Sequence, residues 1–136
     1  MAEFVMKRLV EEAGVADRFE IESAALHTDE IGNGVYPPAR RELARHGITE
    51  CPHRARLMTR ADYDRCDLIV GMDDENAYDL RRLTNGDPQG KCRQLMSFAG
   101  IDREVADPWY TGDFESTWND VLAGCRGILR TAAAAP

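Results

Sequence analysis

The sequence predicts a three-layer α/β domain, in which a parallel sheet is flanked by helices on both faces. Short runs with strand character alternate along the chain with amphipathic stretches of helical period, an order typical of parallel sheets covered by helices. The run Asp67–Met72 has the apolar centre of a strand buried on both faces. The chain has 136 residues, 43% hydrophobic and 30% charged, so residues 1–136 are expected to form one globular domain.

The first third of the chain predicts a helix, a strand and a second helix. Ala2–Ala13 has apolar residues at helical spacing, and Gly14 is a natural stop for a helix. Phe4 falls outside that apolar face, so we expect it to be exposed or held in an interface. Phe19–Ser23 alternates apolar and polar residues as a strand does. A second helix is expected over Ala39–Arg45, after a loop rich in glycine and proline.

The middle of the chain predicts two helices that alternate with two strands. A helix is expected over Thr59–Cys66, capped by its threonine, with Asp62 three residues later. The strand Asp67–Met72 follows, and then a helix over Asp74–Leu83. A third strand is expected over Lys91–Phe98.

The last helix has the clearest amphipathic pattern. Asp113 is expected to be its N-cap, and Thr131–Pro136 is expected to be a frayed tail. The apolar face consists of Phe114, Trp118, Val121, Leu122, Cys125, Ile128 and Leu129.

Charge and cysteine content limit the partners and the compartment. The formal net charge of -7 argues against a nucleic-acid partner, because neutralising phosphates takes clustered lysine and arginine. The apolar runs are far shorter than a membrane span and no secretory signal opens the chain, so we expect a cytoplasmic protein without a membrane partner. The four cysteines lack metal-binding spacing and the histidines lack a ligand pattern, so free thiols, no metal and no cofactor are expected.

The segment Asp107-Pro108-Trp109-Tyr110 has the most chemical character, and it lies between the third expected strand and the last helix. The proline restricts Asp107 to an extended conformation. The two aromatic rings can form an apolar wall beside its carboxyl group, a setting suited to a general acid. From spacing alone, a surface Asp-Pro turn with the aromatic rings in the core is the more common case.

Seven short segments occur in an order and spacing that resemble the low-molecular-weight protein tyrosine phosphatases of the bacterial type. Each segment is weak alone, but together they extend over nearly the whole chain. They are Met1-Ala2-Glu3, Ser23-Ala24-Ala25, Glu30-Ile31-Gly32-Asn33, His46-Gly47-Ile48, His53-Arg54-Ala55-Arg56, Met72-Asp73-Asp74-Glu75-Asn76 and Asp107-Pro108-Trp109-Tyr110. The resemblance implies a four-stranded parallel sheet with helices on both faces, and hydrolysis of phosphotyrosine in protein substrates.

The resemblance also implies site residues. Asp107 matches the general acid that protonates the leaving phenol. Three aromatic residues match the walls of the substrate slot: Tyr36, Trp109 and Tyr110. Three polar residues match a hydrogen-bonded set that supports the catalytic loop: Glu3, His53 and Asp73.

The catalytic loop of that family, Cys-x5-Arg-Ser, does not occur in these 136 residues. The family's loop joins the first strand to the first helix, so the resemblance places Met1-Ala2-Glu3 directly after it. The positions six residues beyond Cys51, Cys66, Cys92 and Cys125 hold Leu57, Met72, Phe98 and Thr131. Without the nucleophile, and without the amides and arginine that hold the phosphoryl oxygens, we expect this chain to be inactive alone.

The first strand of the family lies in the centre of the sheet, between the strands matched by Phe19–Ser23 and Asp67–Met72. We therefore expect the sheet to lack its central strand. Two repairs are compatible with an ordered chain. The flanking strands pair directly, or a second chain fills the gap in a homodimer or by exchange of an element.

Three interpretations of the function stay open. Met1 is an internal methionine of an ordinary phosphatase, or the short chain is a non-catalytic binding or regulatory pseudophosphatase. The codons in frame upstream of Met1 separate these two. In a different class, the chain is a flavodoxin-like module for a nucleotide or flavin. This module is disfavoured, because no glycine-rich loop follows an expected strand and Met72-Asp73-Asp74-Glu75 is acidic.

Overall fold

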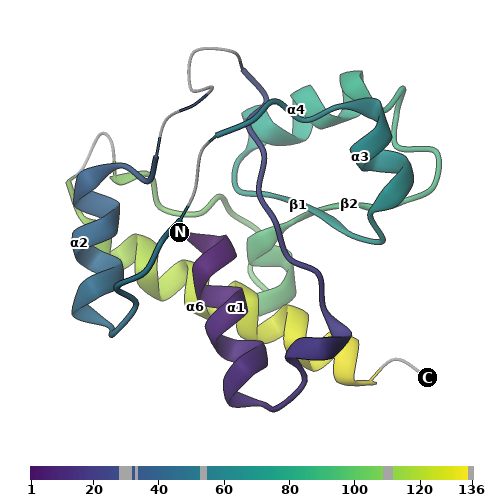
Figure 1. Cartoon of the computed structure of the whole chain (residues 1–136). Helices are drawn as coiled ribbons and strands as arrows, with labels where there is room; N and C mark the ends of the chain where they lie inside the picture. Colours follow the sequence, from purple (N-terminus) through teal and green to yellow (C-terminus); the bar gives the residue numbers. More distant parts are fainter. Residues whose placement is uncertain (28–31, 33, 53–54, 109–111, 135–136) are drawn as a thin grey trace.

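The computed structural model describes residues 1–27, 32, 34–52, 55–108 and 112–134. The elements are α1 (Ala2–Glu12), η1 (Ala16–Arg18), α2 (Pro37–Arg45), α3 (Arg60–Arg65), β1 (Ile69–Gly71), α4 (Asp74–Leu83), β2 (Cys92–Gln94), η3 (Leu95–Ala99) and α6 (Phe114–Ala134). The strands β1 and β2 form a parallel pair, with α3 and α4 on one side and α1, η3 and α6 on the other (Figure 1). The expected α/β architecture, a parallel sheet with helices on both faces, is therefore confirmed.

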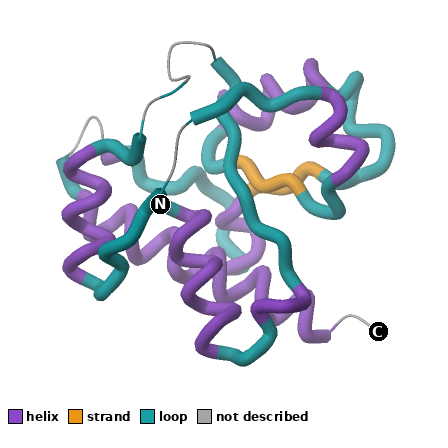
Figure 2. Tube along the Cα trace, viewed as in Figure 1, coloured by secondary structure: helices purple, strands orange, loops and turns teal. Residues whose placement is uncertain are grey.

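The sheet is smaller than the sequence predicts. The expected strand Asp67–Met72 shortens to β1, and the expected strand Lys91–Phe98 shortens to β2. The strand β2 is shorter than expected because the chain enters the 3-10 helix η3 at Leu95. The consecutive residues Leu95 and Met96 are both buried, whereas neighbouring side chains of a strand point to opposite faces of the sheet. Figure 2 shows the two strands as short segments between helices and long loops.

The strand expected over Phe19–Ser23 is wrong. The segment runs past the strand pair as a loop and joins neither β1 nor β2 (Figure 2). Phe19 and Ile21 pack partly buried against the core, while Glu20 and Glu22 are exposed. The alternating pattern thus reflects a segment with one side on the core, and it does not require strand pairing. Direct pairing of this segment with β1, one of the two repairs considered, does not occur in the described part of the chain.

The loop that follows attaches to a distant part of the chain. Ala25 forms an isolated parallel bridge with Leu57. The amide of Ala25 donates to the carbonyl of Arg56 at 2.7 Å, and the amide of Met58 donates to the carbonyl of Ala25 at 2.8 Å. The segment before residue 28 is therefore fixed to the segment that leads into α3.

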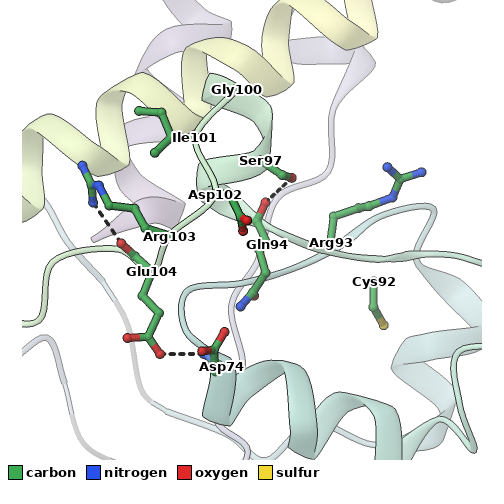
Figure 3. A pocket seen from close by; sticks show the side chains of 10 residues that line it. All are labelled: Asp74, Cys92, Arg93, Gln94, Ser97, Gly100, Ile101, Asp102, Arg103 and Glu104. Carbon is green, nitrogen blue, oxygen red and sulfur yellow. Dashed lines mark hydrogen bonds between the residues drawn. The ribbon is translucent and has the colours of Figure 1, made fainter.

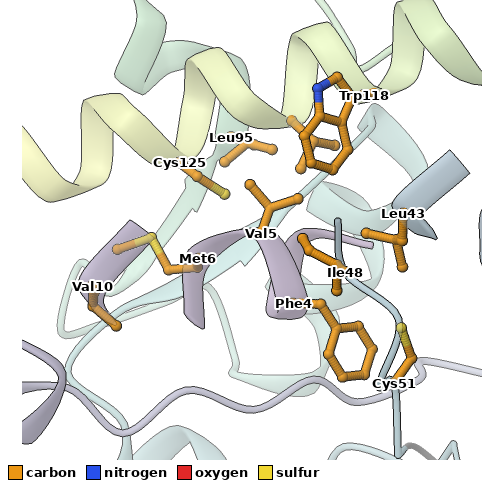
Figure 4. Close-up of a cluster of buried hydrophobic side chains, with 11 residues drawn as sticks. Phe4, Val5, Met6, Val10, Leu43, Ile48, Cys51, Leu95, Trp118 and Cys125 are labelled. Atoms are coloured by element: carbon orange, nitrogen blue, oxygen red, sulfur yellow. The ribbon is translucent and has the colours of Figure 1, made fainter. Parts of the chain in front are cut away.

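The core lies where α1 meets α6 and the segment that follows α2 (Figure 4). Val5, Met6 and Val10 on the expected apolar face of α1 are buried. Phe4, which we expected to be exposed or in an interface, is also buried, with 7% of its surface exposed. The reason is that α1 is covered on two sides, and Ile48 lies beside Phe4 in the cluster (Figure 4).

Local signals set the starts of α2 and α3. The helix α2 begins at Pro37, two residues before the expected Ala39, because proline is well tolerated in the first helical turn. The expected cap of α3 is present as a capping box. The amide of Thr59 donates to the carboxylate of Asp62 at 2.8 Å, and the amide of Asp62 donates to the Thr59 hydroxyl at 3.4 Å.

The helices α4 and α6 lie where the sequence predicts them. The carboxylate of Asp113 accepts the amide of Ser116 at 3.0 Å, which confirms Asp113 as the cap of α6. The frayed tail expected over Thr131–Pro136 is wrong as far as Ala134, because α6 continues to that residue, and residues 135–136 lie outside the described residues. Alanine is the best helix former, and the Thr131 hydroxyl donates to the carbonyl of Gly127 within the helix at 2.9 Å.

Two glycines let α6 lie directly on η3. An added methyl group at Gly127 would overlap the carbonyl of Phe98, and one at Gly124 would overlap the side chain of Leu95. The spacing of the two glycines places them on one face of α6. The 3-10 helix η3 and the last helix are therefore held in close contact.

The structure leaves all four cysteines as free thiols, namely Cys51, Cys66, Cys92 and Cys125. Within the ranges that the structure describes, none of the helices combines the length and the apolar character that crossing a membrane would take.

Candidate functional site

The stretch that leads to Asp107 is attached on one side to the end of β1. The amide of Val105 donates to the carbonyl of Met72, which directly follows β1, at 2.9 Å. The carboxylate of Glu104 accepts the amide of Asp74, in the first turn of α4, at 2.9 Å. A carboxylate at a helix start is also favoured by the helix dipole. Residues 104 and 105 are thus tied to the point where β1 passes into α4.

The same stretch is attached on its other side to α6. Asp120 accepts two hydrogen bonds from the Arg103 guanidinium, at 2.8 and 2.7 Å, and a third from the amide of Ala106 at 2.9 Å. The Thr117 hydroxyl donates to the Ala106 carbonyl at 2.8 Å. The hydrogen bonds from Arg103 hold the pKa of Asp120 below its usual range, so the carboxylate stays charged in the folded chain.

Asp107 follows this stretch directly, and its side chain is exposed. The carbonyl of the next residue, Pro108, accepts the amide of Gly112 at 2.8 Å. The chain then enters α6 at Phe114. The structure therefore presents an exposed carboxyl group from a position that two anchored elements fix.

Tyr36 lies close to the same end of α6. It precedes the first residue of α2, and its ring centroid is 6.2 Å from that of Phe114, with the planes inclined by 39°. The Tyr36 side chain is 49% exposed. The structure thus brings Tyr36 to the start of α6, the helix that follows the Asp107 segment. The contact with Phe114 leaves about half of the surface of Tyr36 open to a ligand.

Glu3 and Asp73 occupy separate elements. Glu3, in the first turn of α1, accepts the Ser23 hydroxyl at 2.6 Å. Asp73 caps α4 by accepting the amide of Asn76 at 2.7 Å, and its carbonyl accepts the Gln94 side chain at 2.7 Å. Both carboxylates hold neighbouring chain segments in place, and Asp73 stands at the carboxyl end of β1. Three other residues predicted from the sequence lie outside the described residues: His53, Trp109 and Tyr110.

A pocket of about 670 Å³ lies beside β2, η3 and the loop after η3 (Figure 3). Its lining includes Arg93 and Arg103 but also the carboxylates of Asp74, Asp102 and Glu104. Neither Asp107 nor Tyr36 lines it. Because Arg103 is already bonded to Asp120, the three carboxylates dominate the charge of this pocket and would repel a phosphate group.

Two of the thiols are poor nucleophiles. Burial raises the pKa of Cys125 to about 12 and the pKa of Cys92 to about 11. The thiolate is the reactive form of cysteine, and both shifts favour the neutral thiol. Neither residue has the environment of an activated catalytic cysteine.

Comparison with known proteins identifies the family. A sequence model of the low molecular weight phosphotyrosine protein phosphatases matches residues 1–135. The chain belongs to this family. The low molecular weight phosphotyrosine protein phosphatase of Rattus norvegicus is 34% identical, over 95% of this chain and 84% of the rat protein. The low molecular weight protein-tyrosine-phosphatase YfkJ of Bacillus subtilis is 29% identical, over 95% of this chain and 84% of its own length.

Solved structures of such phosphatases have the same fold. The crystal structure of YfkJ from Bacillus subtilis superposes with a TM-score of 0.91 at 28% identity, covering 97% of this chain and 84% of that one. SP-PTP, a low molecular weight protein tyrosine phosphatase from Streptococcus pyogenes, gives 0.79 at 33% identity, covering 96% and 81%. The resemblance stated from the sequence segments is thereby confirmed.

Within this low molecular weight phosphatase fold, sequence reasoning missed the residues that position Asp107. Thr117 and Asp120 are three residues apart, so they share one face of α6 and both reach Ala106. Both are buried polar residues, and in the sequence each directly precedes an apolar position of the helix, Trp118 or Val121, which is the signal that could have identified them. Arg103 gives no such signal, because its partner is seventeen residues away in the sequence.

Proposed function

We propose that this chain carries the general acid and the aromatic slot of a phosphotyrosine phosphatase, with Asp107 as the acid. The observation that supports the proposal most directly is the position of Asp107. Its side chain is exposed, directly after a stretch tied to both β1 and α6, in a chain of the phosphatase family. A general acid must be held at a fixed place beside the leaving group, and this arrangement supplies that requirement.

In the proposed reaction a cysteine thiolate of a Cys-x5-Arg segment, which these 136 residues do not contain, attacks phosphorus and takes the phosphoryl group. The P–O bond to the tyrosyl oxygen breaks, and the Asp107 carboxyl group gives its proton to that oxygen. The substrate class is a phosphotyrosine side chain in a protein. Tyr36, Trp109 and Tyr110 would line the slot for its flat ring, since aromatic surfaces pack well on one another. Glu3, His53 and Asp73 would hold the surrounding segments, as the contacts of Glu3 and Asp73 suggest.

The proposal includes inactivity of these 136 residues when they are alone. They contain no Cys-x5-Arg segment, and the pKa values of Cys92 and Cys125 favour the unreactive thiol. A general acid contributes about 10²–10⁴-fold to a rate, but only while a nucleophile is attacking. Asp107 alone therefore gives no turnover.

An assay with an aryl phosphate such as p-nitrophenyl phosphate tests both parts. The 136-residue chain should give the rate of a blank without protein. A chain with a Cys-x5-Arg-Ser segment joined ahead of Met1 should hydrolyse the substrate, and Asp107→Asn should lower its kcat by about 10²–10⁴-fold. Asp102→Asn is the matched control, because it removes a carboxylate from the preceding exposed loop, and it should leave kcat unchanged.

Two outcomes would contradict the proposal. Turnover by the 136-residue chain that disappears in the Asp107→Asn variant would show that this chain holds a complete site. An extended chain whose kcat is the same with Asp107→Asn as without it would show that Asp107 is not the acid.

The proposal also covers the gap that the sequence predicts at the centre of the sheet. In the described residues β1 pairs with β2 and with no other strand, and the Phe19–Ser23 segment does not cover its second edge. The lack of pairing between Phe19–Ser23 and β1 in the described residues supports the second of the two expected repairs, a second chain at the gap. An open strand edge pairs readily with another chain. A homodimer is therefore proposed, and a monomer at every concentration in sedimentation would overturn it.

A further inference from the structure

A second group of reactive side chains lies where the segment before residue 28 passes α4 (Figure 1). The Nε2 atom of His27 is 2.9 Å from the Oδ2 atom of Asp79 and 3.3 Å from the Oε1 atom of Glu75. Glu75 and Asp79 are four residues apart on α4, so their carboxylates lie on one face of the helix. One nitrogen and two carboxylate oxygens thus converge from two segments that are far apart in the sequence.

The contact between His27 and Asp79 is unusual. The Oδ2 atom of Asp79 is buried, and no residue in the described ranges gives it a hydrogen bond. The His27 nitrogen lies within ion-pair distance of this oxygen, but the contact lacks the alignment of a hydrogen bond. Buried carboxylate oxygens are nearly always hydrogen-bonded or bound to a metal. An oxygen and a nitrogen that meet without a hydrogen bond are what two ligands of one cation would present.

The spacing of the three atoms suits a tetrahedral cation. Bonds of about 2.0–2.2 Å to zinc put neighbouring ligand atoms about 3.3 Å apart. The distances from His27 to Glu75 and Asp79 are 3.3 and 2.9 Å, and all three ligand atoms lie within 4.8 Å of one another. Small side-chain movements would therefore complete the coordination.

We propose that His27, Glu75 and Asp79 bind one zinc ion, with water at the remaining position. An imidazole ligand favours zinc over magnesium and calcium, which prefer oxygen ligands alone. Two carboxylates neutralise the charge of the ion. The side chains of His27 and Glu75 are 57% and 73% exposed, so an ion can reach them from solvent. Spacing in the sequence gave no sign of this site, because His27 is far from the two acids along the chain.

The ion would join two parts of the fold. The segment that ends at His27 is already fixed to Arg56 and Met58 through Ala25. Zinc at His27 would tie this segment to α4 as well. Because such a site exists only in the folded chain, zinc should raise the unfolding temperature.

Calorimetric titration of the 136-residue chain with zinc chloride tests the proposal, together with thermal unfolding. One zinc per chain is expected. His27→Gln and Asp79→Asn should each weaken binding at least about 10-fold and remove the rise in unfolding temperature. His46→Gln and Asp64→Asn change a histidine and an exposed acid outside the cluster, and they should bind zinc like the parent.

Free thiols also bind zinc, so the titration is repeated after iodoacetamide has blocked the thiols that react in the folded chain. Cys92 and Cys125, which burial keeps in the neutral thiol form, compete little for zinc, because the thiolate is the form that binds a metal. Binding that survives alkylation and disappears with His27→Gln supports the site. Absence of zinc binding by the parent, or equal binding by the parent and His27→Gln, overturns it. If a variant does not fold, cobalt added to the parent decides the matter. Paramagnetic broadening should then be confined to amides near residues 25–27 and 75–79, and broadening centred on the cysteines would overturn the proposal.

Discussion

The Arg103 guanidinium and the Asp120 carboxylate face each other through two parallel hydrogen bonds of 2.8 and 2.7 Å. The two side chains differ in exposure, at 49% for Arg103 and 12% for Asp120. Asp120 also accepts the amide of Ala106. The loss of either residue should therefore have unequal effects on the fold.

Replacing Asp120 should destabilise the chain more than replacing Arg103. Asp120→Ala leaves the Ala106 amide without its acceptor and should lower the free energy of unfolding by about 1–3 kcal/mol. Arg103→Met removes a half-exposed ion-pair partner and should lower the free energy of unfolding by clearly less than Asp120→Ala does. Urea unfolding followed by circular dichroism measures both, with Arg126→Met on the exposed face of α6 as control. Equal losses of unfolding free energy in Asp120→Ala and Arg103→Met would mean that the hydrogen bond from the Ala106 amide to Asp120 adds no stability.

Gly127→Ala should destabilise the chain, which is the opposite of the usual effect inside a helix. Exchange of glycine for alanine in a helix interior normally stabilises by about 1 kcal/mol. Here the new methyl group would overlap the carbonyl of Phe98 and push η3 away from α6, so a loss of about 1–3 kcal/mol is expected. Arg126→Ala, at the neighbouring exposed position, is the control. An unfolding temperature above that of the parent would contradict the close contact.

Acid should destabilise the chain partly through Asp62. Hydrogen bonds from Arg56, and then from the Thr59 amide, hold the pKa of Asp62 well below its usual range. The unfolded chain then binds more protons than the folded chain, so this contribution is present above a pH of about 4, the pKa of an unfolded aspartate, and is lost as the pH falls further.

Asp62→Asn should therefore lower the unfolding temperature at pH 7 and flatten its decrease between pH 5 and pH 3, in thermal scans at a series of pH values. Asp64→Asn, an exposed aspartate on the same helix, should leave the shape of the curve unchanged. An unchanged acid slope in Asp62→Asn would show that the paired carboxylate does not set it.

Cys92 and Cys125 should resist alkylation near neutral pH. With a pKa of about 11, Cys92 has about 0.1% thiolate at pH 8, compared with about a quarter for a free cysteine. Cys125, with a pKa of about 12, has still less. Mass spectrometry after timed treatment with iodoacetamide measures each site, and a peptide with one cysteine is the control. Labelling of either residue at the rate of the peptide would contradict the burial of these thiols.

Local chemistry made several elements predictable. The caps at Thr59 and Asp113 and the helix α4 could be inferred because each depends on residues within one helical turn. Phe19–Ser23 could not be placed correctly from its alternation, since an extended loop with one side on the core has the same pattern as a strand. Phe4 was misplaced because its burial depends on Ile48, which only the folded chain brings near.

The candidate site was predictable in part for the same reason. Asp107 could be selected from its own segment and from the order of segments in the family. The residues that hold its position could not, because the Arg103–Asp120 pair joins a loop to a helix. His27 was given no role from the sequence, since its two carboxylate neighbours lie about one third of the chain away.

One face of α6 contacts two separate segments, η3 and the stretch that leads to Asp107. Gly124 accommodates η3, and Asp120, one turn earlier, fixes the approach to Asp107. A helix turns by about 100° per residue. One residue inserted between positions 120 and 124 would therefore rotate one attachment away from the other by more than a quarter turn. Length changes should be tolerated in the exposed loop of residues 100–102. The helical phase between Asp120 and Gly124 has to be kept for Asp107 to stay near the end of β1.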